Sequence, residues 1–249
     1  MEINIAQKIT AAATILALPF ALGAFVLAWA PANQFNLTDP RADGYVQPRS
    51  IDKLIKKVQD STVTVFCRNI DPKKDSFGSA WVIDMENTQG KKYSTTLITN
   101  YHVIDTCLEG KGMLTVAPLY KKEVPAIIDN WDEENDLAAL ATSIKLKPLK
   151  LSQYEPWPGY WVAAVGSADG YEGSVAFGNV LNGTKYEVLM TTPLSRGNSG
   201  GPLVDNEGNV VGTNSFGQKD EQYNGAMSLN ALCVRLMECK NDIFWERED

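Results

Sequence analysis

The chain has 249 residues, of which 44% are hydrophobic and 21% charged, a composition that excludes disorder of the whole chain. This length suits one large all-β domain or two smaller ones. The formal net charge is −7, and the 23 lysines and arginines form no long basic run. We therefore expect no nucleic-acid surface.

The first element in chain order is an apolar, uncharged segment, Ile9–Ala30, within a predicted targeting region of residues 1–32. As a helix it can span a bilayer core of about 30 Å, and it exceeds the about 7–15 apolar residues of a usual signal peptide. We expect an uncleaved signal anchor that holds the chain in the membrane. A cleaved signal peptide and a buried soluble helix are the alternatives.

Both membrane interpretations place the rest of the chain across the membrane. The anchor predicts a single-pass membrane protein with an extracytoplasmic domain. Cleavage instead predicts a secreted or periplasmic protein.

Residues 33–50 are rich in Pro, Asn, Asp and Gly and are predicted to form a linker. Ser50 is the expected N-cap of a helix over Ile51–Gln59. Further along, short β-prone runs alternate with turn residues, a pattern typical of a sandwich or barrel. The predicted strands are Thr62–Arg68, Ala80–Asp84, Thr95–Thr99, Met113–Ala117, Glu123–Asp129, Leu137–Ala141, Tyr160–Val165, Ser174–Leu181, Glu187–Thr192, Pro202–Asp205, Val210–Phe216 and Gly225–Leu229.

A C-terminal helix is predicted to begin at an asparagine cap, Asn230, because apolar residues follow at helical spacing. The residues on its apolar face would be Leu232, Cys233, Leu236 and Met237. We expect residues 51–249 to form one domain.

The four cysteines include no C-x-x-C pair, and the chain has a single histidine, so we expect no structural metal site. An even number of cysteines is compatible with two disulfides in an oxidising compartment. Four buried free thiols are the alternative.

The most informative segment is Gly197-Asn198-Ser199-Gly200-Gly201. Flanking glycines allow a tight turn that exposes the Ser199 hydroxyl and lets a substrate approach the backbone. The N–H groups of Gly197 and Ser199 are then the expected donors of an oxyanion hole. A plain surface turn is the alternative, because all five residues are common in turns.

Further segments accompany this serine in a recognisable order: Gly78–Ile83, Thr99–Ile104, Asn135–Leu140, Val165–Ser167, Ser174–Val180, Val211–Gly217 and Gly225–Ser228. With the serine segment, they resemble the HtrA/Deg-type branch of the trypsin-like serine proteases over about residues 60–235. The resemblance implies an all-β fold, a chymotrypsin-like double six-stranded β-barrel followed by the C-terminal helix. It also implies that no cofactor is needed and that the substrate is a protein or peptide.

The resemblance assigns a catalytic triad of Ser199 as nucleophile, His102 as general base and Asp136 as the acid that orients the base. A serine needs a base, and His102 is the only histidine available. Asp136 has close rivals in Asp132, Glu133 and Glu134, which we interpret as a solvated turn. The chain order His, Asp, Ser and the strand predicted after the serine argue against an α/β-hydrolase, despite the G-x-S-x-G pattern.

The position before the serine is Asn198, where trypsin has an aspartate that binds a newly freed N-terminus. We therefore expect no trypsin-type activation. By analogy with the family, the substrate pocket involves Pro193, Leu194, Ser195, Arg196, Asn214, Ser215, Phe216, Gly225, Ala226 and Met227. No acid occurs between Glu187 and Asp205, so we expect a small or medium aliphatic residue before the scissile bond.

The resemblance also brings Cys67 near Cys107, because both flank the first-barrel strands around His102. Cys233 and Cys239 lie on one predicted helix, where pairing is awkward. The chain after Ser199 is too short for the PDZ domains of many HtrA relatives, and the oligomeric state cannot be carried over.

The main hypothesis is a serine endopeptidase that forms an acyl-enzyme. A catalytically silent binding module with the protease fold is the alternative, and a membrane protein with chance motifs is a third.

Overall fold

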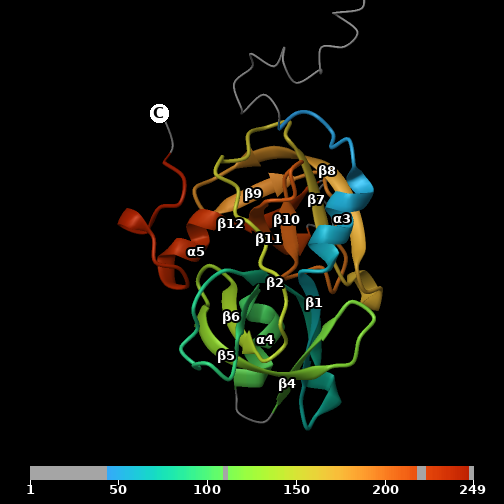
Figure 1. Ribbon diagram of the computed structural model, residues 1–249, viewed down its shortest axis with the longest axis vertical. Helices are drawn as coiled ribbons and strands as arrows, with labels where there is room; N and C mark the ends of the chain where they lie inside the picture. The colour runs from blue at the N-terminus through green and yellow to red at the C-terminus, as the bar shows by residue number, and fades with distance from the viewer. Residues whose placement is uncertain (1–43, 109–111, 218–222, 247–249) are drawn as a thin grey trace, which may run out of the picture. The chain divides into compact units, whose positions relative to one another are not determined.

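The computed structural model describes residues 44–108, 112–217 and 223–246, which belong to one compact unit, Arg41–Asp249. Two closed six-stranded antiparallel barrels make up this unit (Figure 1). The first barrel contains β1 (Thr62–Arg68), β2 (Ser76–Ile83), β3 (Thr95–Thr99), β4 (Met113–Pro118), β5 (Val124–Asp132) and β6 (Leu137–Thr142). The second contains β7 (Trp161–Gly166), β8 (Ser174–Gly183), β9 (Glu187–Met190), β10 (Pro202–Val204), β11 (Val210–Gly217) and β12 (Asn224–Ser228).

The strand order is β1-β2-β3-β6-β5-β4 in the first barrel and β10-β11-β12-β9-β8-β7 in the second. Read from β7, the second barrel has the same topology as the first. Each predicted β run corresponds to one of these strands, and the double-barrel fold expected from the sequence is confirmed. Closure removes the exposed strand edges that an open sheet would present to solvent.

The barrels are joined by a buried interface that belongs to the core of the second barrel. Trp81 of β2 is fully buried within that core, and its indole Nε1 donates to Thr213 Oγ1 at 3.1 Å. The hydroxyls of Thr64 and Ser167 form a second buried hydrogen bond between the barrels, at 2.6 Å. Such buried polar pairs favour one relative position of the two barrels, because breaking either pair leaves an unpaired polar group in the core.

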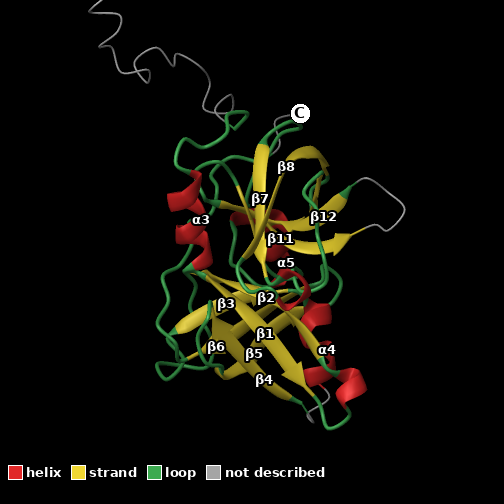
Figure 2. Cartoon of the chain, turned by 90° about the vertical axis from the view of Figure 1, so that its right-hand side faces the viewer, coloured by secondary structure: helices red, strands yellow, loops and turns green. Residues whose placement is uncertain are grey.

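Three α-helices and three 3₁₀ turns complete the described residues: α3 (Ile51–Gln59), α4 (Tyr101–Leu108), α5 (Leu229–Arg235), η2 (Pro72–Lys74), η3 (Ala168–Gly170) and η4 (Lys240–Asp242). Helix α3 has its predicted bounds and contacts β1 and β7, so it packs against both barrels (Figure 2). Ser50 is at its N-cap position but makes no capping hydrogen bond with its side chain. Helix α4 was not predicted.

The C-terminal helix ends earlier than predicted, at Arg235, with Leu236 at the C-cap. It is also not capped by Asn230, because the N-cap position is Ser228. Asn230 is buried instead, and its Oδ1 accepts hydrogen bonds from the backbone N–H groups of Phe244 at 2.7 Å and Trp245 at 3.0 Å. This asparagine therefore holds the end of the described chain against the helix.

All four cysteines are paired, so the free-thiol alternative is wrong. The Cys67–Cys107 disulfide, with a Cα–Cα distance of 5.9 Å, joins β1 to α4 as expected. Cys233 and Cys239, for which pairing on one continuous helix was expected to be awkward, form a disulfide with a Cα–Cα distance of 5.4 Å. The reason is that the helix stops before Cys239, so the chain turns back toward Cys233.

The predicted membrane segment Ile9–Ala30 lies outside the described residues. Within residues 44–108, 112–217 and 223–246, no helix has the length and hydropathy needed to cross a bilayer.

Candidate active site

Ser199 lies in the loop between β9 and β10, which folds tightly onto β2 of the first barrel. Two glycines allow this path: Gly197 has φ of 94° and Gly200 has φ of 85°. A Cβ atom at Gly200 would lie 2.1 Å from the Ser79 carbonyl oxygen, and one at Gly197 would lie 2.2 Å from that of Ser167. Larger residues at these positions would be both strained and blocked.

Ser79 of β2 holds the loop from the other barrel. Its backbone N–H donates to the Ser199 carbonyl at 2.8 Å, and its hydroxyl donates to the Gly197 carbonyl at 2.7 Å. Ser79 is fully buried. The serine segment is therefore held by a strand far away in sequence, and Ser79 was not identified from the sequence.

The peptide bond between Arg196 and Gly197 has a defined orientation. The Arg196 carbonyl accepts a hydrogen bond from the Asp169 N–H at 2.6 Å, so the Gly197 N–H points to the opposite side of this trans peptide. Among the described residues, no acceptor pairs with the N–H groups of Gly197 or Ser199. Two unpaired donors beside a serine hydroxyl are the arrangement that an oxyanion hole needs.

His102 and Asp136 form a close pair between helix α4 and the turn before β6 in the first barrel. His102 is in the first turn of α4, directly after β3, and its Nδ1 lies 2.9 and 3.0 Å from the two carboxylate oxygens of Asp136. The backbone N–H of His102 also donates to Asp136 Oδ1 at 3.0 Å. Asp136 has φ of 49° in the turn before β6, and Asn100 Nδ2 donates to its carbonyl at 2.8 Å.

The neighbouring acids have other roles or none at the site. Asp132 is buried and accepts a hydrogen bond from Asn135 Nδ2 at 2.7 Å, which stabilises the turn itself. The Glu133 carbonyl accepts the Asp136 N–H at 3.3 Å. Of the four candidate acids, Asp136 alone contacts the histidine.

Two opposing effects act on the pKa of Asp136. Burial would raise it, but hydrogen bonds and charge attraction from His102, with a hydrogen bond from Ser215, outweigh burial and lower it below its ordinary value. The side chain of Asp136 is therefore an anion at neutral pH, suited to stabilise a protonated imidazole.

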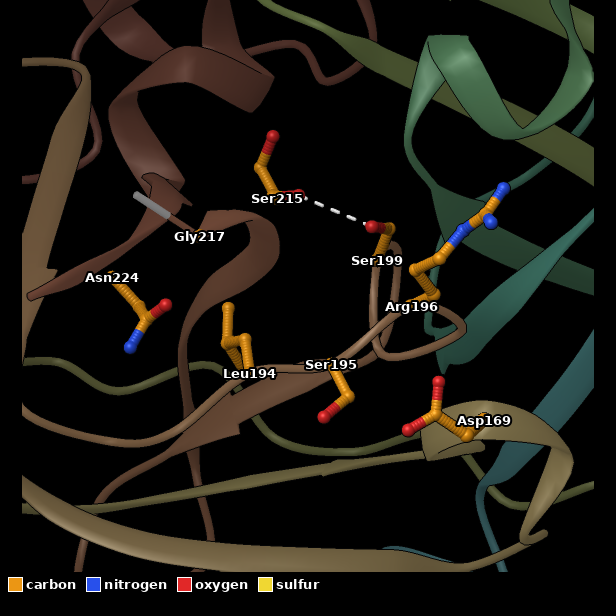
Figure 3. Close-up of a pocket in the computed structure, with 8 residues that line it drawn as sticks. All are labelled: Asp169, Leu194, Ser195, Arg196, Ser199, Ser215, Gly217 and Asn224. Carbon is orange, nitrogen blue, oxygen red and sulfur yellow. Dashed lines mark hydrogen bonds between the residues drawn. The ribbon is translucent and has the colours of Figure 1, made fainter. Parts of the chain in front are cut away.

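Ser215 of β11 joins the acid to the serine. Its hydroxyl donates to Asp136 Oδ2 at 2.6 Å, and its carbonyl accepts the Ser199 hydroxyl at 3.1 Å (Figure 3). No hydrogen bond joins Ser199 to His102 in the described part of the chain. Rotation about the Cα–Cβ bond of Ser199 is enough to redirect its hydroxyl, and such bonds often form only when substrate binds.

A cavity of about 420 Å³ opens beside Ser199 (Figure 3). Its lining residues are Asp169, Leu194, Ser195, Arg196, Ser199, Ser215, Gly217 and Asn224. Four of the predicted pocket residues, Leu194, Ser195, Arg196 and Ser215, are among them. Asp169, Gly217 and Asn224 also line the cavity but were not among the predicted pocket residues.

The other predicted pocket residues lie elsewhere. Pro193 is exposed without lining the cavity, and Gly225 and Ala226 are buried in β12. Asn214 is fully buried and its carbonyl accepts the Gly200 N–H at 2.7 Å, so it supports the serine loop.

Two predicted pocket residues remain. Met227 lines a separate cavity of about 340 Å³, which is bordered by Glu134 and Glu187. Phe216 pairs through its backbone with Gly225. Roles in substrate binding for the residues away from the cavity stay predictions.

Comparison with known proteins assigns the family. The model of the trypsin-like peptidase domain matches residues 78–212, more than half of the chain, and the chain belongs to this family. A probable periplasmic serine endoprotease, DegP-like, of Marinomonas sp. is 32% identical over 152 residues, which cover 57% of this chain and 30% of that protein. The expected resemblance to the HtrA/Deg branch is thereby confirmed.

The chain is also similar in sequence to an anti-sigma factor and in fold to a solved endoprotease structure. Anti-sigma-I factor RsgI9 of Acetivibrio thermocellus is 28% identical over 153 residues, covering 59% of this chain and 21% of that protein. The crystal structure of the serine endoprotease from Yersinia pestis superposes with a TM-score of 0.64 at 22% identity, over 78% of this chain and 67% of that one. This chain thus spans less than a third of the length of the two curated relatives.

Proposed function

We propose that this protein is a serine endopeptidase that hydrolyses peptide bonds through an acyl-enzyme. The observation that carries the proposal is the chain of contacts from His102 through Asp136 and Ser215 to Ser199, within a trypsin-like fold. Membership of the trypsin-like peptidase family supports the same activity.

In the first half of the reaction, His102 accepts the proton of the Ser199 hydroxyl as the oxygen attacks the substrate carbonyl carbon. The carbonyl oxygen becomes an anion, which the N–H groups of Gly197 and Ser199 stabilise. Protonated His102 then gives its proton to the leaving amine, and the C–N bond breaks. Asp136 stabilises the imidazolium and keeps Nδ1 protonated, so that Nε2 is the basic nitrogen.

In the second half, a water molecule gives a proton to His102 and attacks the acyl carbon. The second tetrahedral intermediate uses the same two donors, and its collapse releases the acid product and returns the proton to Ser199. Resetting the hydrogen bond from Ser199 to the Ser215 carbonyl completes the cycle.

We propose further that activity needs no cleavage of the trypsin type. Asn198 carries no charge to pair with a freed N-terminus, and its Oδ1 lies 3.4 Å from the Ser174 hydroxyl. The orientation of the Gly197 N–H instead depends on the bond from the Asp169 N–H to the Arg196 carbonyl, which is internal to the domain, and Ser79 holds the next peptide through the Gly197 carbonyl.

We place the domain, residues 51–249, outside the cytoplasm, attached to the membrane through Ile9–Ala30 or released by cleavage after it. The periplasmic assignment in the names of the DegP-like relatives supports this location. Both disulfides support it too, because such bonds persist in oxidising compartments. Extraction of membranes with alkaline carbonate distinguishes an anchored protein, which stays in the pellet, from a cleaved one.

The test of the proposed activity is labelling of the full chain with a fluorophosphonate probe. Labelling is expected for the wild type, and loss of labelling for Ser199→Ala and His102→Ala. Ser143→Ala is the matched control, because Ser143 is exposed and follows β6 at the end opposite Asp136. A folded wild-type protein that gives no Ser199-dependent label would refute the proposal and favour a silent binding module.

A further inference from the structure

Asn224 is the polar side chain at the end of the active-site cavity away from Ser199. It is the first residue of β12 and pairs across the strands with Gly217 of β11. Figure 3 shows Asn224 and Gly217 on one side of the cavity, with Ser199 and Arg196 on the other and Leu194 between them. A side chain that enters beside Ser199 must cross the cavity to reach this amide.

The orientation of the Asn224 amide is fixed by a single contact. Its Nδ2 donates to the Thr192 carbonyl at 2.9 Å, and a carbonyl oxygen requires a donor at that position. The opposite orientation would place two acceptors against each other, so Oδ1 is the atom left over. No donor among the described residues reaches Oδ1.

Gly217 keeps this oxygen accessible. A Cβ atom at position 217 would lie 2.8 Å from Asn224 Oδ1, closer than such atoms approach without displacement. The absence of a side chain therefore leaves space directly in front of an unpaired acceptor.

Charge at this end of the cavity narrows the choice of ligand. Leu194, Ser195, Gly217 and Asn224 carry no charge, whereas Asp169 and Arg196 lie toward the Ser199 side (Figure 3). Among the described residues at this end there is no carboxylate for a lysine or arginine, and an acid would meet the amide oxygen as a second acceptor. A neutral donor on a long side chain is the best match.

We propose that Asn224 Oδ1 determines specificity by accepting a hydrogen bond from the residue before the scissile bond, and that this residue is glutamine. This inference rests on the proposed peptidase function. Glutamine combines a neutral N–H donor with the reach to cross the cavity, and Leu194 packs against its methylene groups. The aliphatic preference expected from the sequence did not take Asn224 into account.

The test uses the full chain and four fluorogenic peptides that differ only at the residue before the cleaved bond: Gln, Leu, Lys or Glu. The wild type is expected to cleave the Gln peptide with kcat/KM about tenfold above the Leu peptide, the size of one hydrogen bond. In Asn224→Leu, which keeps the branched shape but removes the acceptor together with the donor to the Thr192 carbonyl, this ratio should fall to about one. Asn224→Asp, whose carboxylate must turn away from the Thr192 carbonyl because both are acceptors, should instead raise kcat/KM for the Lys peptide.

Either of two results would overturn the inference: a wild-type preference for Leu or Lys, or a Gln-to-Leu ratio that is the same in Asn224→Leu. A second arm does not depend on catalysis. Calorimetric titration of Ser199→Ala with product peptides ending in Gln or Leu should give about tenfold tighter binding for Gln, lost on adding Asn224→Leu. If no peptide is cleaved and the fluorophosphonate probe fails, the proposed function is lost, and this binding arm alone decides the role of Asn224.

Discussion

Replacement of Ser79 by alanine tests whether β2 of the first barrel orients the N–H groups of Gly197 and Ser199, the proposed oxyanion donors of the second barrel. The substitution removes the hydroxyl that donates to the Gly197 carbonyl at 2.7 Å, while the backbone bond from Ser79 N–H to the Ser199 carbonyl stays. No other donor among the described residues pairs with the Gly197 carbonyl. The peptide between Gly197 and Asn198 then keeps the bond from the Asn198 N–H to the Ser195 carbonyl at 3.1 Å, but the backbone of Gly197, whose N–H is the proposed donor, is held less firmly.

The cost follows from burial. An unpaired buried carbonyl costs about 1–3 kcal/mol. If this cost falls on the transition state, the rate constant drops about 5- to 150-fold. Because the oxyanion forms only in the transition state, kcat should fall while KM changes little.

Steady-state kinetics on a peptide that the wild type cleaves, together with a thermal melt of each variant, measures both effects. Ser143→Ala serves as the control because Ser143 is exposed. A lower melting temperature with unchanged kcat would show that Ser79 stabilises the fold without orienting the donors, and the reasoning above would be refuted.

Three other changes give opposite or graded effects on stability. The pKa of Asp136 is lower in the folded than in the unfolded chain, so its ionised form stabilises the fold. This contribution to the free energy of unfolding is complete above the unfolded pKa of about 3.9 and is lost as the pH falls through the folded pKa. In an acid titration followed by circular dichroism, Asp136→Asn should not show this loss. Asp205 has the opposite effect, because burial raises its pKa despite backbone hydrogen bonds, so its ionised form destabilises the fold. Asp205→Asn should therefore raise the melting temperature at pH 7 and leave it unchanged at a pH below the folded pKa. A lower melting temperature at pH 7 would contradict this. Removing the Cys67–Cys107 disulfide, which spans 40 residues, should cost about 4 kcal/mol in urea unfolding, against about 2 kcal/mol for Cys233–Cys239, which spans 6; equal costs would argue against loop entropy as the cause.

Local sequence patterns predicted the strands well because each barrel strand is a short β-prone run between turn residues. Helix α4 was missed because it has only eight residues, and with Thr106 and Cys107 near its end these show little helical periodicity. The end of α5 was placed too late because Leu236 and Met237 continue the apolar spacing after the backbone has left the helix. Periodicity records which side chains face the core, and it does not record where the hydrogen-bonded helix stops.

The site residues differ in what made them recognisable. Ser199 was recognisable from the glycines around it, and His102 from being the single histidine of the chain. Both signals can be read directly from the sequence. Asp136 stood among four acids, and the distinguishing fact is tertiary: Asp132 is paired with Asn135, which leaves Asp136 to contact the histidine. From the sequence, only the resemblance of Asn135–Leu140 to the family motif pointed to Asp136, and the contact itself depends on the fold.

Asn224 and Ser79 were missed because their roles depend on how strands pair. The resemblance predicted Gly225 as a pocket residue. Successive side chains of a strand point to opposite faces, and Asn224, which pairs with Gly217, lines the cavity in place of Gly225. A shift of one residue exchanges the two faces of a strand. Pocket residues therefore required the register of β11 and β12, which the sequence alone did not provide.

The hydrogen bond from Ser199 to the Ser215 carbonyl makes the resting site a competition between two acceptors. The carbonyl holds the hydroxyl at 3.1 Å, and in the proposed mechanism the hydroxyl must turn to His102 before the attack. A substrate whose backbone donates to the Ser215 carbonyl would occupy that acceptor and release the hydroxyl toward the base. Binding of a correct peptide would then prepare the nucleophile, so that a free enzyme reacts slowly with small probes and faster with probes that carry a peptide. Comparing label rates for a bare fluorophosphonate and a peptidyl phosphonate measures this difference, and equal rates would contradict the competition.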